Sequence, residues 1–242
     1  MTTPPHGETI AAMDGATRVV RVPARDVVPA EEDVLRLAGS ASARSRPLVR
    51  ERVAALTPLL VSCATPAYAL AMYAVETAAG GRLALAGGRL LSFGVDAIGA
   101  APGALAALLC TMGEGPDAAE TELAAASGPL DAWMFDALVL AALESLELLA
   151  WQDAARRAGR LGLYVGMPLV PAVGDLPPAA QHELFACLDA TATGVSLDEN
   201  GTMRPLKSFS CWVPLVGEPT GSDARLHLCE SCDLEACRFR SR

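Results

Sequence analysis

The segment from Pro129 to Gly159 constrains the fold of this chain most strongly. It reads PLDAWMFDALVLAALESLELLAWQDAARRAG and contains no proline or glycine between its two ends. Its start is acidic, and Arg156 and Arg157 lie near its end, which is the charge order that the helix macrodipole favours. Glycine after the last helical turn is a common stop signal. We therefore expect one long central helix that ends at Gly159.

Three acidic side chains mark one side of this predicted helix. At 100° per residue, Asp136, Glu144 and Glu147 fall within an arc of roughly 80°, and apolar residues cover most of the remaining surface. The pattern is typical of a buried helix with one wet or functional stripe, and an ordinary solvated face has the same pattern. Trp133 and Trp151 lie among the apolar residues and are expected in the core.

The rest of the chain mixes short strands and helices without regular alternation. Strands are predicted at TRVVRVP, which ends at Pro23, at AYALAMYAVE and GGRLALAGGRLLSFG as a hairpin, and around a turn at Asn200-Gly201. Helices are predicted within PAEEDVLRLAG, from about Pro47 to Thr57, and at 116–127 and 178–189. The run GALAALLCTMG fits a buried strand or a helix equally well. These elements predict one α+β domain over residues 16–242, after a disordered tail at 1–15.

Charge and composition exclude several classes of partner. The chain has 242 residues, 52% of them hydrophobic, and a net charge of −9, so it can bury a core but lacks the basic surface that nucleic acids and anionic membranes require. Its first residues do not combine a basic start with an apolar run, and we expect a cytoplasmic protein. The most apolar stretch, Val95 to Gly113, is interrupted by Pro102 and glycines, which predicts core and not a membrane span.

Most standard catalytic motifs are absent from the sequence. There is no phosphate-binding loop, dinucleotide glycine fingerprint, nucleophile elbow or zinc-protease helix motif, so a hydrolase or kinase has no support. Cys63, Cys110 and Cys187 each lie in an apolar run and are expected to be core residues.

The C-terminal tail, from about residue 225 to 242, carries the sharpest chemical signal. Cys229, Cys232 and Cys237 form a C-x2-C-x4-C pattern, in which three thiolates can reach one ion from a short stretch of chain. A structural zinc site needs a fourth ligand, for which His227 and Cys211 are candidates. An iron–sulfur cluster, a redox thiol group and an idle structural tail are the alternatives.

Four collinear segments resemble a known family. They are EEDVLRLAG, LLCTMGEGPDAAETEL, FDALVLAALESL and the long run from VPAVGDLPPAAQHELF to RPLKSFSCWVPL. Together they resemble the activation, or reactivation, domain of cobalamin-dependent methionine synthase, in particular its free-standing versions. The eight-residue separation of Asp136 and Glu144 matches the acids on that domain's long helix. Free-standing members also end in a cysteine triplet before an aromatic-arginine pair, here Phe239 and Arg240.

The resemblance implies a fold and a role. The implied fold is a single α+β domain with a twisted, mostly antiparallel sheet and flanking helices. The implied role is to bind S-adenosylmethionine beside a corrinoid protein, so that an oxidised cobalamin can be reduced and remethylated. The chain would then be an accessory component of a cobalamin-dependent methyltransferase in methionine biosynthesis, with a corrinoid-binding protein or methyltransferase subunit as its partner.

The segment that holds the ligand in the methionine synthase domain is altered here. That domain uses an R-x-x-x-G-Y segment, whereas this chain has Pro168 at the arginine and Ala172-Val173 at the glycine and tyrosine. The alternative is therefore a degenerate scaffold module that keeps the fold and a cysteine-bound metal but does not bind S-adenosylmethionine. A third reading is a redox protein that passes electrons to cobalamin. The remaining pocket candidates are Asp136, Glu144, Gly174, Asp175, Lys207, Ser208 and Ser210.

Overall fold

A computed structural model describes residues 10, 13–39, 46–79, 81–94, 96, 98, 102–174 and 176–219. Most of the expected N-terminal tail, residues 1–15, lies outside these ranges. The C-terminal tail with His227, Cys229, Cys232 and Cys237 also lies outside them, as does Asp175. The structure therefore does not test the predictions for these residues.

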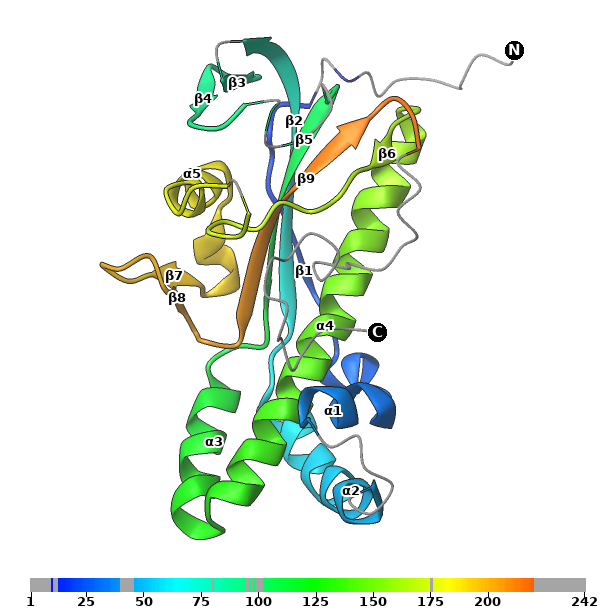
Figure 1. Ribbon diagram of the computed structural model, residues 1–242, viewed down its shortest axis with the longest axis vertical. Coiled ribbons are helices and arrows are strands. Elements are labelled where there is room, and N and C mark those ends of the chain that lie inside the picture. Colours follow the sequence, from blue (N-terminus) through cyan, green and yellow to red (C-terminus); the bar gives the residue numbers. More distant parts are fainter. Residues whose placement is uncertain are drawn as a thin grey trace.

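Seven antiparallel strands form one sheet in the order β4-β3-β2-β5-β9-β6, with β1 paired to β2 (Figure 1). The strands are β1 (Arg18–Arg21), β2 (Ala67–Ala79), β3 (Arg82–Leu85), β4 (Arg89–Leu91), β5 (Ala104–Thr111), β6 (Tyr164–Val165) and β9 (Ser208–Val216). The ambiguous apolar run is the strand β5, and every residue of it is buried. It is apolar throughout because β2 and β9 flank it and both its faces are covered. The prediction of an α+β domain is confirmed.

Helices cover the two faces of the sheet unequally. On one face lie α1 (Glu31–Leu37), α2 (Arg46–Cys63), α3 (Gly115–Ala126) and α4 (Pro129–Arg160). The helix α5 (Ala180–Cys187) and the short helix η4 (Ala190–Thr193) pack on the other face. Figure 1 shows α1, α2 and α3 gathered around one end of α4, far from the β3–β4 hairpin. Among the described helices, none is long and apolar enough to cross a lipid bilayer.

Smaller elements complete the chain. The 3-10 turn η2 (Ala24–Val27) follows β1, and the hairpin of β7 (Ser196–Leu197) and β8 (Met203–Arg204) precedes β9. This hairpin surrounds the Asn200-Gly201 turn, as the sequence predicted. The second helix is longer than predicted, since α2 continues past Pro58 to Cys63 and does not end at Thr57.

The central helix α4 is present over 32 residues, with two corrections to the sequence prediction. It passes through Gly159 and ends after Arg160, because Gly162 adopts the left-handed conformation with φ of 71°. The Leu163 amide then donates to the Ala158 carbonyl at 3.0 Å and closes the helix. The prediction that Trp133 is a core residue is wrong, since it is 40% exposed near the start of the helix, whereas Trp151 is 1% exposed.

Candidate functional site

A buried cation held by two carboxylates lies directly before β9. Lys207 is 9% exposed, and its ammonium contacts Asp136 of α4 and, at 2.9 Å, Glu120 of α3. Burial opposes the charge on Lys207, but the hydrogen bonds and Coulomb attraction of both carboxylates outweigh it and raise the pKa of Lys207 above its usual range. The sequence paired Lys207 and Asp136 as site candidates and missed Glu120.

Ser208 and Ser210 lie on the opposite face of β9 from Phe209, because side chains alternate along a strand. The Ser208 hydroxyl donates to the Pro205 carbonyl at 2.8 Å and lies 2.9 Å from the Thr111 hydroxyl. The Ser210 hydroxyl contacts the Gln181 side-chain amide of α5 at 3.0 Å. The two serines therefore form a polar row on this face of β9, in which Ser208 contacts β5 and Ser210 contacts α5, separate from the Lys207 ion pairs.

The segment before α5 runs along the outer edge of β9 and then turns away. Leu169 and Trp212 exchange two backbone hydrogen bonds of 2.8 and 2.9 Å, and the Gly166 amide donates to the Pro214 carbonyl at 2.7 Å. Backbone groups alternate between the edges of a strand, so the Ser210 peptide groups also face this outer edge. No backbone partner for them is found within the described ranges. Among the described residues, this short stretch of peptide edge has no partner where the chain turns toward α5.

The turn that follows has a left-handed backbone conformation at an alanine. Ala172 has φ of 66° and is the sole non-glycine residue with positive φ among those described. Gly174 is also left-handed, with φ of 58°, and Val173 between them is 37% exposed. Ala172 is the residue that replaces glycine in the family segment. The backbone at position 172 therefore has a conformation that favours glycine, although the residue is alanine.

Replacing Ala172 by glycine is expected to raise the free energy of unfolding by about 1 kcal/mol, because a left-handed alanine carries that order of steric strain. Chemical denaturation measures the change. The matched control is Ala118→Gly on the exposed side of α3, where glycine should lower stability by up to about 1 kcal/mol. Equal losses in both variants would contradict the strain at position 172.

The acidic stripe predicted for α4 is not one wet face. Glu144 pairs with Arg36 of α1, and it lies two helical turns, or about 12 Å, from Asp136 along the axis. Glu147 is only 8% exposed, and burial first, then the Glu144 charge, raises its pKa well above the ordinary range. The structure therefore brings Asp136 to Lys207 but leaves Glu144 in a different neighbourhood.

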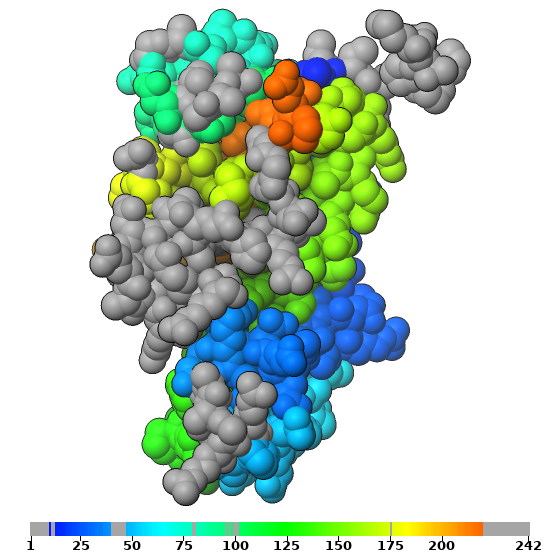
Figure 2. Space-filling model, turned by 45° about the vertical axis from the view of Figure 1, so that its right-hand side comes forward, coloured from blue at the N-terminus to red at the C-terminus, as the bar shows by residue number. Residues whose placement is uncertain are grey.

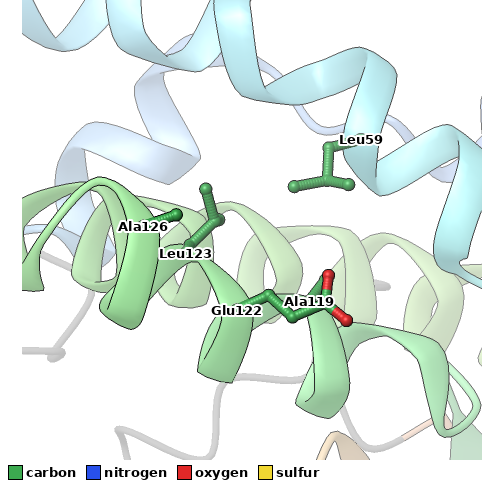
Figure 3. A pocket seen from close by; sticks show the side chains of 5 residues that line it. All are labelled: Leu59, Ala119, Glu122, Leu123 and Ala126. Atoms are coloured by element: carbon green, nitrogen blue, oxygen red, sulfur yellow. The ribbon is translucent and has the colours of Figure 1, made fainter.

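The described residues form no metal-binding group of their own, so the prediction of a metal in the cysteine tail stays untested. Within the described ranges, no three His, Cys, Asp or Glu side chains gather to hold a metal ion. Cys211 is fully buried on the α4 side of β9, near Cys110, and burial raises the pKa of both thiols well above the usual range. An open hollow of about 200 Å³ lies between α2 and α3 (Figure 3), and none of the residues that line it is a site candidate: Leu59, Ala119, Glu122, Leu123 and Ala126.

Comparison with known proteins finds similarity at the level of structure and not of sequence. No family model matches the sequence, and no curated protein matches it. The chain is an α+β domain whose antiparallel sheet is covered on one face by a long helix and its satellites. More particularly, it has the fold of the MetH reactivation domain. The crystal structure of that domain bound to AdoHcy superposes with a TM-score of 0.63 at 13% identity, over 95% of this chain and 86% of that one.

Proposed function

We propose that this chain is an accessory component of corrinoid-dependent methyl transfer that binds S-adenosylmethionine beside a corrinoid-binding partner. The observation that carries the proposal is the fold, which is shared over 95% of the chain with a reactivation domain whose crystal structure contains AdoHcy. The left-handed Ala172 supports it, because the turn adopts a conformation that favours glycine at the position where the family segment has glycine. The corresponding cytoplasmic location, and a metal in the cysteine tail, remain predictions.

The ligand would lie along the turn at 170–174 and the free edge of β9. There the Ser210 peptide groups would offer hydrogen bonds to the amino-acid and ribose parts of a nucleoside ligand, and the buried Ser210 hydroxyl would hold this edge in place through Gln181. The exposed Val173 offers an apolar surface. Pro168 carries no charge, and the Lys207 ammonium is already paired with Asp136 and Glu120. Backbone amides and hydroxyls would therefore hold the ligand carboxylate.

The chemistry of this chain would be positioning. S-adenosylmethionine supplies the methyl group, and the reactive metal belongs to the cobalamin of the partner. The side chains of β9 and α5 would fix the donor, and the rigid sheet beneath would keep it in one orientation. The net charge of −9 favours a partner whose docking face is basic.

Isothermal titration of the full chain with S-adenosylmethionine and with S-adenosylhomocysteine tests the proposal. We expect saturable binding of both, and Ser210→Ala should weaken it by about tenfold, because the variant loses the hydrogen bond with Gln181 that holds this edge of β9 in place. Ser62→Ala on the exposed side of α2 is the matched control and should bind normally. Absence of saturable binding to either ligand would contradict the proposal.

A degenerate scaffold module is the second candidate, and the uncharged turn favours it. Pro168 and Ala172 replace the arginine and glycine of the family segment, which removes a carboxylate partner from the ligand. Such a module would still bind its corrinoid-binding partner while showing no heat with S-adenosylmethionine. Binding of that partner with and without the ligand therefore separates the two candidates.

A further inference from the structure

Three guanidinium groups converge on one carboxylate near the end of α4. Asp153 lies 3.3 Å from Arg157, 3.4 Å from Arg156 and 3.7 Å from Arg18 of β1. The Tyr68 hydroxyl of β2 donates to the same carboxylate at 3.3 Å. The Asp153 side chain is 10% exposed, so it is the anchored centre of the group.

The arginines outnumber the acids at this place. Arg160 lies one helical turn after Arg156 and is exposed, and no carboxylate among the described residues pairs with it. We call Arg18, Arg156, Arg157 and Arg160 the α4 arginine cluster. Its four positive charges face one Asp153 charge and the helix C-terminus, which is equivalent to about half a negative charge. A local excess of more than two positive charges remains on a chain whose net charge is −9.

The cluster is open to solvent. The Arg18 side chain is 55% exposed and the Arg156 side chain is 63% exposed. Gly159 lies between Arg156 and Arg160, and a side chain at its position would meet nothing within 4 Å. The final turns of α4 form part of the molecular surface in Figure 2. An anion therefore has direct access to several guanidinium groups at once.

We propose that the α4 arginine cluster binds a phosphate group carried by a small molecule. Arginines from β1 and α4 approach from two elements, which suits the three or more acceptor oxygens of a phosphate, and the guanidinium fork matches phosphate geometry. Asp153 and Tyr68 hold the inner edge of the cluster in place while the outer N–H groups remain directed to water. The site lies about 25 Å along α4 from Asp136, so it is separate from the Lys207 ion pairs.

Isothermal titration of the full chain with inorganic phosphate and with adenosine monophosphate, at low and constant ionic strength, tests this site. We expect saturable binding, with chloride at equal ionic strength giving none. Arg156→Gln and Arg18→Gln, both at exposed side chains, should each weaken phosphate binding by about tenfold. Equal affinity for the two probes identifies phosphate as the recognised group, and tighter binding of adenosine monophosphate adds a contact with the nucleoside.

Arg82→Gln is the matched control, because Arg82 is exposed on β3, outside the cluster, and has the same charge. It should leave phosphate affinity unchanged. An equal loss in Arg82→Gln would show a general charge effect and overturn the site. So would titration curves for phosphate and chloride that coincide, or full affinity in Arg156→Gln and Arg18→Gln.

Discussion

Replacing Lys207 by methionine should lower the free energy of unfolding by about 2–4 kcal/mol, as measured by urea denaturation at pH 7. Loss of the buried ammonium leaves Asp136 and Glu120 as two facing carboxylates without a cation. Removing one member of a buried ion pair costs about 3–5 kcal/mol. The expected loss is smaller here because the Asp136 and Glu120 side chains are 29% and 34% exposed and water stabilises them in part.

The Arg50–Glu31 pair provides the control, since its Arg50 side chain is 68% exposed. Arg50→Met should leave the free energy of unfolding nearly unchanged, because water screens an exposed pair. Combining Lys207→Met with Asp136→Asn and Glu120→Gln should recover part of the lost stability, because the unpaired charges are then removed. If Lys207→Met keeps full stability but loses S-adenosylmethionine binding, Lys207 is a ligand contact and not a structural anchor.

Local sequence signals were sufficient for the elements that depend on local physics. The α4 segment lacks helix breakers over its whole length, and the structure confirms it as a helix. The run that forms β5 could not be assigned, because alanine and leucine suit both states and its pairing with β2 and β9 comes from residues far apart in the chain. The end of α4 was misplaced because Gly159 and Gly162 both suit a stop, and only the latter has the left-handed backbone.

The candidate site was predicted less completely than the fold, for a physical reason. Glu120 carries no motif, and its role follows only from the packing of α3 against α4, which brings it to Lys207. Likewise, the sequence showed a lost glycine at position 172, whereas the structure shows that the backbone still has the conformation glycine favours. The same argument applies to Glu147, which shares a helix face with Glu144 but is covered by the sheet.

Glu147 should make the wild-type chain less stable as the pH rises, and Glu147→Gln should remove that dependence. Burial raises the pKa of this carboxyl well above its ordinary value of 4.5, so the folded state keeps the proton that the unfolded chain releases. Below pH 4.5 both states are protonated and the residue has no effect on the pH profile. Above it, unfolding releases a proton, and stability falls by up to about 1.4 kcal/mol per pH unit until the folded carboxyl also ionises.

Urea denaturation at pH 5, 6, 7 and 8 measures this effect as the difference between wild type and Glu147→Gln at each pH. Between pH 5 and 7 the difference should grow by up to about 3 kcal/mol in favour of the glutamine variant, which is neutral and nearly the same size. Glu122→Gln, on the exposed side of α3, is the control and should follow the wild-type profile. Parallel profiles for wild type and Glu147→Gln would mean that the carboxyl ionises in the folded state as it does in water. The contact of α4 with β5 and β9 would then have to admit solvent at Glu147, which the burial of Cys110 and Cys211 beside it argues against.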